Sequence, residues 1–290
     1  MSTKYPIISV TGSSGAGTST VKNTFDQIFR REGIKSVSIE GDAFHKYSRA
    51  DMKAELEKRL AAGDHSFSHF SLEANELEEL ERVFREYGES GTGRTRVYVH
   101  SDAEAAELGV PSGDFTDWKP LEADSDIMFY EGLHGAVNAG DTNIAQYADL
   151  KIGVVPVINL EWIQKMHRDR NERGYSTEAI TDVILRRMDA YLKCIMPQFS
   201  QTDINFQRVP VVDTSNPLIS RSIPTADESL VVIRFANPRG IDFPYLTSMV
   251  GGSWMSRANS LVVPGGKMEL AMQLILTPLI LRLAENSRRV

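Results

Sequence analysis

The sequence of 290 residues contains a single cysteine, Cys194, and carries a formal net charge of −7 at pH 7. One cysteine cannot form an internal disulfide, so an intramolecular dithiol switch is excluded. The acidic excess argues against a general nucleic-acid binder, and we expect no nucleic-acid partner. Internal repeats and low-complexity tracts are also lacking. With 41% hydrophobic and 24% charged residues, the composition is that of an ordinary globular protein.

Long apolar runs are absent as well. The longest near the C-terminus, Leu274–Leu283, is interrupted by Thr277, Pro278 and Arg282, whereas a membrane span needs about 20 predominantly apolar residues. The first residues run directly into a strand-like segment, which leaves no room for a cleavable signal. We therefore expect a soluble, cytoplasmic protein with no membrane partner.

A lysine is missing from the most informative motif of the chain. The phosphate-loop pattern G-x-x-x-x-G-K-[ST] is matched by Gly12, Gly17 and Ser19, but Thr18 stands where the lysine belongs. The whole segment comprises Gly12, Ser13, Ser14, Gly15, Ala16, Gly17, Thr18, Ser19 and Thr20. An apolar strand-like run precedes it and a helical pattern follows, as the motif requires.

This context predicts that the loop holds the phosphates of ATP. Backbone N–H groups that turn inward, together with the positive end of a helix dipole, bind a polyphosphate even without the ammonium group. Ser19 is then expected to bind Mg²⁺. The alternative is a glycine-rich turn that merely joins a strand to a helix.

Strands and helices are predicted to alternate along the chain. Strands are expected at 7–10, 36–39, 94–99, 127–132, 150–157, 209–212, 230–235 and 261–263, and helices at 21–29, 52–60, 74–87, 161–173, 177–192 and 268–284. This order indicates an α/β fold like that of P-loop nucleoside triphosphate hydrolases, with a mixed, mostly parallel sheet and helices on both faces. We expect a single kinase domain over residues 1–290, with an irregular insertion near 101–125 and a lid helix near 161–174.

Two carboxylates follow predicted strands. Asp42 lies in the run Glu40–His45, beyond the second strand, where ligands of parallel sheets bind. It is a candidate base for the proton of an attacking hydroxyl, with a turn or capping aspartate as the alternative. Glu131 ends the strand at 127–132 and is a candidate for holding Mg²⁺, although carboxylates at strand ends are common. Arg49 is a candidate for binding an anionic acceptor, unless it is simply solvated.

The predicted lid helix carries a charged face. At 100° per residue, Lys165, Arg168, Asp169 and Arg173 fall within an arc of about 140°. A solvated helix with i,i+4 pairs between Lys165, Asp169 and Arg173 would show the same pattern. Beside a phosphate loop without lysine, however, the cluster predicts a lid that supplies the missing charge to a transferring phosphoryl group.

Together these motifs resemble the phosphoribulokinases, and Thr18 in particular resembles the bacterial, octameric type. The resemblance rests on the phosphate loop, Glu40–His45, Phe129–His134 and His167–Gly174, and it extends to Val211–Pro217 and Phe243–Tyr245. The loop alone would also fit uridine kinases or pantothenate kinases.

The resemblance implies ATP-dependent phosphorylation of D-ribulose 5-phosphate to ribulose 1,5-bisphosphate in the Calvin cycle. It implies Asp42 as the base, and Asp169 and Glu131 as groups that serve Mg²⁺ or the transferring phosphoryl group. His45, Arg49 and Arg173 would bind the sugar phosphate, while Lys165 and Arg168 would act near the phosphates. His100 and His134 are either secondary contacts or ordinary polar residues.

Regulation and assembly follow from the same resemblance. The bacterial type is a homo-octamer that NADH activates and AMP inhibits, and Arg31, Arg234 and Arg257 resemble its effector-site positions. Arginine suits phosphate recognition, although each of the three could equally form an interface salt bridge. A thioredoxin switch is excluded, since no paired cysteines are present.

Two other functions remain open. A uridine-kinase-like nucleoside kinase would share the loop, base and lid but needs an aromatic or amide pocket for its base, whereas Arg49 and Arg173 favour an anionic sugar phosphate. A non-catalytic ATP-binding regulator would need no proton acceptor, and Asp42 argues against it.

Overall fold

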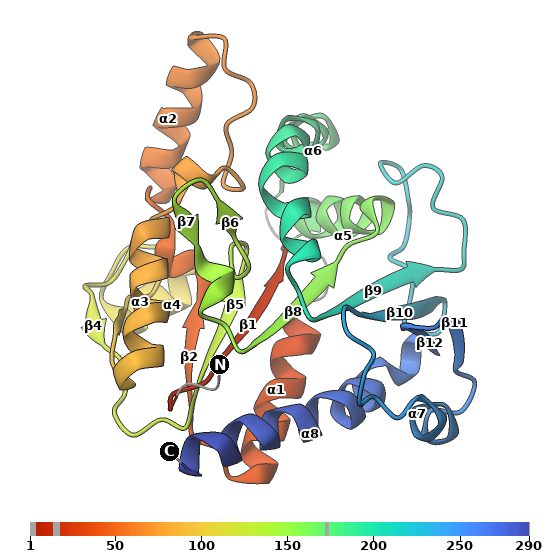
Figure 1. Cartoon of the computed structure of the whole chain (residues 1–290). Helices are drawn as coiled ribbons and strands as arrows, with labels where there is room; N and C mark the ends of the chain where they lie inside the picture. Colours follow the sequence, from red (N-terminus) through yellow and green to blue (C-terminus); the bar gives the residue numbers. More distant parts are fainter. Residues whose placement is uncertain (1–3, 14–17, 172–173, 290) are drawn as a thin grey trace.

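The computed structural model describes residues 4–13, 18–171 and 174–289, and its centre is an eight-stranded sheet (Figure 1). The strand order is β11-β12-β10-β9-β8-β1-β5-β2. These strands are β1 (Ile7–Gly12), β2 (Ser36–Glu40), β5 (Ile127–Gly132), β8 (Leu150–Val155), β9 (Ile204–Pro210), β10 (Ser229–Phe235), β11 (Trp254–Arg257) and β12 (Ser260–Pro264). Strands β2, β5, β1, β8 and β9 of this sheet run parallel to one another. Strands β10, β12 and β11 extend it, and each of them is antiparallel to its neighbour. The predicted mixed, mostly parallel sheet is confirmed.

Helices cover both faces of this sheet. They are α1 (Thr18–Glu32), α2 (Arg49–Ala61), α3 (Leu77–Ser90), α4 (Asp102–Leu108), α5 (Ile158–Asn171), α6 (Thr177–Ala190), α7 (Phe243–Met249) and α8 (Met268–Arg289). Two small two-stranded ribbons lie outside the sheet: β3 (Arg94–Thr95) with β4 (Lys119–Pro120), and β6 (Asn138–Ala139) with β7 (Thr142–Asn143). None of the helices in the described part of the chain is long and apolar enough to cross a membrane.

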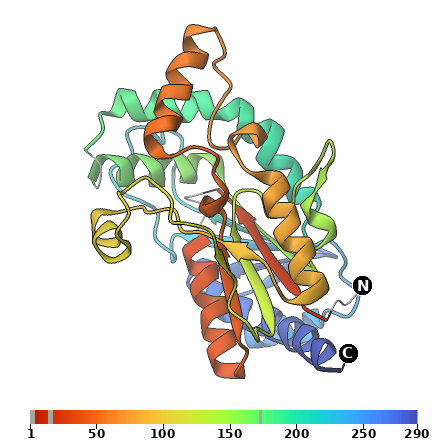
Figure 2. The same ribbon diagram turned by 90° about the vertical axis from the view of Figure 1, so that its left-hand side faces the viewer.

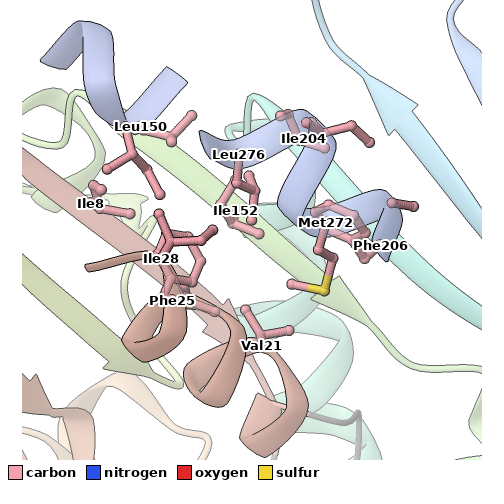
Figure 3. Close-up of a cluster of buried hydrophobic side chains, with 14 of the residues drawn as sticks. Ile8, Val21, Phe25, Ile28, Leu150, Ile152, Ile204, Phe206, Met272 and Leu276 are labelled. Carbon is pink, nitrogen blue, oxygen red and sulfur yellow. The ribbon is translucent and has the colours of Figure 1, made fainter. Parts of the chain in front are cut away.

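The side chains of β1 point alternately to the two faces of the sheet, and they divide the core into two layers. Ile8 and Val10 are fully buried in the cluster that includes residues of α1 and α8, whereas Ile7 belongs to the cluster formed with α3. In Figure 3, Ile8 and Ile152 of adjacent strands lie close to Phe25 and Ile28 of α1 and to Leu276 of α8. Burial of each such side chain contributes about 1.5–3 kcal/mol. The layers therefore hold the sheet rigid beneath its loops.

The loops at the carboxyl ends of the parallel strands carry the candidate site. The chain leaves β1 toward α1, β2 toward α2 and β8 toward α5 at this edge. Helices α2, α5 and α6 lie beyond it, at the top of Figures 1 and 2, while α8 lies at the opposite end. This arrangement places the predicted phosphate loop and lid helix at one edge of the sheet.

The structure differs from the predicted elements in several places. Strand β9 begins at Ile204 rather than at 209, because it alternates buried Ile204 and Phe206 with polar residues instead of forming an apolar run. The segment 94–99 forms only the short β3, and 101–125 is not irregular throughout. Within 101–125, helix α4 begins after Ser101, whose hydroxyl accepts the backbone N–H of Glu104. The helix ends before Gly109, its C-terminal capping residue. Strand β11 and helix α7 were not predicted.

Candidate functional site

The phosphate loop joins the central strand to the first helix. Strand β1 ends at Gly12, which is in register with Val154 of β8, and α1 begins at Thr18. Ser14, Gly15, Ala16 and Gly17 lie outside the described residues, as do the side chains of Thr18 and Ser19. Ser13 is buried, and its hydroxyl donates a hydrogen bond to Oε1 of Glu161 at 2.7 Å. The strand and the helix that the motif requires are therefore both present.

Asp42 lies on a 3₁₀ turn, Gly41–Phe44, directly after β2. Its Oδ1 is 3.1 Å from Nε2 of His45, and its Oδ2 is 3.6 Å from Nε2 of His100. Burial raises the pKa of this carboxyl, but the hydrogen bond from His45 and the charges of His45 and His100 outweigh it and lower the pKa to about 2. Asp42 is therefore an ionised proton acceptor at neutral pH.

The two histidines that the sequence left open lie close to this turn. His100 contacts Asp42 directly, as its distance shows. His134 is buried and reaches the turn through Asn75, whose Nδ2 lies 3.0 Å from its Nε2. Burial lowers the pKa of His134 to about 3, so this ring is neutral. Neither Asn75 nor His69 was singled out in the sequence, and the ring centroid of His69 lies 5.1 Å from that of His45 in a tilted arrangement.

Arg49 joins α2 to the segment that follows β3. Its guanidinium donates to Oγ of Ser112 at 3.2 Å and to the carbonyl of His100 at 3.0 Å. Gly113 accepts the backbone N–H of Arg49 at 2.7 Å, and its φ is +91°. A Cβ at Gly113 would stand 2.7 Å from Cβ of Arg49, so this position requires glycine. Arg49 is exposed but held in place by its bonds to the segment that also carries His100.

Glu131 is half-buried at the end of β5, in register with Val10 of β1 and Glu40 of β2. A cation that the sequence did not single out lies beside it. Lys22, one helical turn after Thr18, donates to Oε1 of Glu40 at 2.5 Å. Burial lowers the pKa of Lys22, but the bond to Glu40 and the charges of Glu40 and Glu131 raise it overall. In the sequence, the position of Lys22 one helical turn after Thr18 was the signal that could have identified this cation.

Helix α5, the predicted lid, carries a buried charge cluster. Nζ of Lys165 and Nε of Arg168 both donate to the carboxylate of Asp169, the latter at 3.2 Å. The i,i+4 pair of Lys165 and Asp169 is present but not solvated, since the two side chains are only 11% and 4% exposed. Burial and the charge of Arg187 lower the pKa of Lys165 to about 8, although Asp169 opposes them. Arg173 lies outside the described residues.

Two further charged residues belong to this region and were not predicted. Glu161, in the first turn of α5, accepts the Ser13 hydroxyl, and burial raises its pKa against the opposing effects of Ser13 and Arg187. Arg187 of α6 lowers the pKa of both Lys165 and His45 by its charge. The amphipathic pattern of α6 gave no signal that Arg187 faces the site rather than solvent.

The two carboxylates proposed for Mg²⁺ have different surroundings. The charge of Glu131 acts on Lys22, whereas Asp169 is bound by Lys165 and Arg168. Within the described ranges, no group of three or more His, Cys, Asp or Glu residues is arranged to hold a metal ion. This fits Mg²⁺ that arrives with nucleotide, because Mg²⁺ keeps several waters and binds through one or two carboxylates and the substrate phosphates.

The three candidate effector arginines are not all together. Arg234 on β10 and Arg257 on β11 are both exposed and both in register with Ser260 of the intervening β12. Both arginines therefore lie opposite the same residue of β12, although the pairing of β11 with β12 is irregular between Met255 and Arg257. Arg31 instead donates to Oγ1 of Thr277 at 2.9 Å on α8. Helix α8 covers the face opposite Arg234, so one chain does not bring Arg31 to Arg234.

Comparisons with known proteins point to one family. The model of the phosphoribulokinase / uridine kinase family matches residues 7–215. Phosphoribulokinase 1 of Cereibacter sphaeroides is 77% identical over 288 residues, which is 99% of both chains. Phosphoribulokinase of Nitrobacter vulgaris is 68% identical over 286 residues, again 99% of both. The solved structure of a phosphoribulokinase from Rhodobacter spheroides has 74% identity and a TM-score of 0.91, covering 98% of this chain and 99% of its own.

Proposed function

The chain belongs to the phosphoribulokinase / uridine kinase family, and on this premise we propose that it is a phosphoribulokinase. It transfers the γ-phosphoryl group of ATP, as the Mg²⁺ complex, to the C1 hydroxyl of D-ribulose 5-phosphate and forms ribulose 1,5-bisphosphate for the Calvin cycle. The observation that carries this assignment is the full-length identity of 77% to a curated phosphoribulokinase. The ionised carboxylate of Asp42 supplies the proton acceptor that this reaction needs.

The proton of the C1 hydroxyl passes to Asp42 as the oxygen attacks the γ-phosphorus. In phosphoryl transfer most of the catalysis comes from positioning and charge neutralisation. The phosphate loop from Gly12 to Thr20 holds the nucleotide, and Ser19 and Glu131 hold its Mg²⁺. Asp169 orients Lys165 and Arg168, which neutralise the charge that develops on the transferring group, because all three are joined in one buried cluster.

The proposed site of the sugar phosphate is the turn that carries Asp42. His45 and Arg49, with Arg173, are proposed to hold its 5-phosphate near Asp42. In the described part of the chain, His45 is 3.1 Å from Asp42, and Arg49 bonds the carbonyl of His100, whose ring also faces Asp42. A doubly charged acceptor suits this group of basic side chains better than a neutral nucleoside does.

Several finer features belong to the same proposal. The chain acts as one kinase domain with α5 as a lid over the nucleotide. It assembles as a homo-octamer, and NADH activates it through Arg31, Arg234 and Arg257 while AMP opposes activation. ATP and sugar phosphates are cytoplasmic metabolites, which supports our expectation that the enzyme works in the cytoplasm.

A competition assay tests the proposed activity. Purified enzyme receives MgATP with ribulose 5-phosphate and uridine together, and both phosphorylated products are measured. We expect the sugar bisphosphate alone. Phosphorylation of uridine would instead indicate a nucleoside kinase, and ATP binding without turnover of either acceptor would indicate a regulator.

A further inference from the structure

Asn75 lies at the centre of a buried hydrogen-bond network behind the Asp42 turn. It follows the 3₁₀ turn Leu72–Ala74 and forms an isolated antiparallel bridge with His45. Two backbone bonds flank this bridge, from Lys46 to the carbonyl of Ala74 at 3.0 Å and from Glu76 to the carbonyl of Phe44 at 2.7 Å. The backbones of His45 and Asn75 are therefore held together although 30 residues separate them.

The side-chain amide of Asn75 has only one chemically sensible orientation. Its Nδ2 is 2.8 Å from the carbonyl oxygen of Ser71 and 3.1 Å from that of His69. Carbonyl oxygens can only accept hydrogen bonds, so the amide nitrogen must face them. Oδ1 then faces Nδ1 of His45 at 2.8 Å. Because this oxygen can only accept, Nδ1 of His45 must carry a hydrogen.

The other ring nitrogen of His45 faces the base. Nε2 is 3.1 Å from Oδ1 of Asp42, which is also an acceptor. A histidine that donates from both nitrogens is an imidazolium ion. Asn75 therefore favours the charged form of His45 from one side while Asp42 favours it from the other.

His134 completes the network without competing for the proton. Its Nε2 lies 3.0 Å from Nδ2 of Asn75, whose two hydrogens also face the carbonyls of Ser71 and His69, so His134 contacts the amide nitrogen and not the oxygen that faces His45. Among the described residues, Nδ1 of His134 is buried without a hydrogen-bond partner. A neutral His134 costs less in that position than a charged one, because burial penalises charge.

We propose that Asn75 is a positioning residue, which fixes His45 as an imidazolium ion hydrogen-bonded to Asp42. This inference rests on the proposed role of Asp42 as the base. Asn75 would then prepare two parts of the acceptor site at once: the cation that meets the sugar phosphate and the carboxylate that takes the proton. It does so without touching the substrate.

Other charged and titratable groups also surround His45. They are Asp42 on its own turn, His69, Tyr98, His100, Arg96, which donates to the His45 carbonyl, and Arg187 of α6. Burial and Arg187 lower the pKa of His45, but the hydrogen bonds with Asp42 and Asn75 raise it overall. Removing the acceptor of Asn75 leaves Arg187 in place, so the pKa of His45 should then fall.

Nitrogen NMR of the histidine rings tests the inference on the whole enzyme without substrate. The chain has six histidines, and the His45→Gln variant identifies the His45 signals. In the wild type we expect both ring nitrogens of His45 to be protonated beyond the ordinary histidine pKa of about 6.5. A neutral His45 ring near that pH in the wild type would overturn the proposal before any variant at Asn75 is made.

Two variants separate positioning from simple packing. Asn75→Leu fills similar space without an acceptor, and the pH at which His45 loses its charge should fall by about one unit or more. Asn75→Asp keeps an acceptor and should keep the imidazolium. Asn205→Leu is the matched control, because Asn205 is also a buried asparagine and bonds to Thr202 and Phe199 at the start of β9. It should lower stability without moving the His45 titration.

Kinetics supply a second measurement. In Asn75→Leu the KM for ribulose 5-phosphate should rise by about tenfold and that for ATP by much less, and Asn75→Asp should restore part of the loss. An unchanged His45 titration in folded Asn75→Leu would refute the role of Asn75. A shifted titration with no activity toward ribulose 5-phosphate in the wild type would instead refute the proposed function and leave the network intact.

Discussion

At the residue scale, the proposed base is kept ionised by histidines rather than by arginine or lysine. Asp42 is in contact with His45 and His100, and no shift in the pKa of Asp42 could be inferred from its place in the sequence alone. Histidine charge changes near neutral pH, whereas arginine charge does not. The environment of the base is therefore sensitive to pH even though Asp42 itself titrates far below neutrality.

Replacing Asp42 with asparagine tests its role directly. The amide keeps the shape and polarity of the side chain but cannot accept the proton, so kcat should fall by about 10²-fold or more with a modest change in KM. Steady-state kinetics with ribulose 5-phosphate measures this. Asp51→Asn, in the first turn of α2, is the control and should leave kcat unchanged. Near-wild-type turnover in Asp42→Asn would remove Asp42 from the mechanism.

The same carboxylate should leave a signature in acid unfolding. The pKa of Asp42 in the folded protein, about 2, lies below its ordinary value of 3.8. Its contribution to stability is therefore fully present above the ordinary value and is lost as pH falls through the folded value. Denaturant titrations of wild type and Asp42→Asn should thus differ most near neutral pH and converge in that acid range. A difference independent of pH would contradict this assignment.

At the scale of elements, the proposed lid helix α5 carries the buried charges of Lys165 and Arg168, and the segment around Gly113 brings His100 to Asp42. Lys165 on α5 is proposed to replace the lysine that is missing at position 18. Its charge matters most in the transition state, so Lys165→Met should depress kcat far more than it weakens ATP binding. Lys193→Met, an exposed lysine paired with Asp189, is the control. Unchanged turnover would mean that the loop amides and Mg²⁺ suffice.

Gly113→Ala tests whether the segment that carries His100 helps to bind the acceptor. The change introduces a Cβ at φ +91° and 2.7 Å from Arg49 Cβ, so the segment must move. We expect the KM for ribulose 5-phosphate to rise by about tenfold while that for ATP hardly changes. Gly109→Ala has a similar φ of +70° but nothing within 4 Å of the added atom. Equal effects of both changes would show that backbone strain alone is responsible.

Elements with local signals were predictable, and those that depend on distant contacts were not. Asp42 and Glu131 follow strands, so their place at the carboxyl edge of the sheet could be inferred from the pattern alone. Asn75 was missed because the predicted helix at 74–87 included it, whereas α3 begins at Leu77 and Asn75 meets His45 through a bridge between distant segments. The start of β9 was predicted too late in the sequence, because Asn205 and Arg208 interrupt the apolar pattern of this strand.

At the scale of the whole molecule, the antiparallel end of the sheet carries the proposed control. Arg234 and Arg257 are both in register with Ser260 of β12, while Arg31 contacts α8 on the face of the sheet opposite Arg234. An effector that uses all three must therefore bridge subunits, as a closed symmetric oligomer permits. Such an effector acts through its differential contacts in the two arrangements of the subunits.

We therefore predict that NADH raises the activity and that AMP opposes it. Arg234→Ala or Arg257→Ala should abolish this activation and leave basal turnover largely intact, because both residues lie far along the sheet order from β1 and β2. Activity assays with sedimentation measure both aspects. A monomer at working concentration, or activity indifferent to NADH, would contradict this model of control and leave the catalytic proposal untouched.

The central place of β1 has a consequence for the biosynthesis of the protein. Its two neighbours in the sheet are β5 and β8, and Ile7 pairs with Met128 on one side and bonds to Asp149 on the other, 142 residues away. A nascent chain that has just emerged with its phosphate loop therefore has no sheet to hold that loop in shape. We therefore expect the nascent chain to acquire ATP binding only after β8 has left the ribosome.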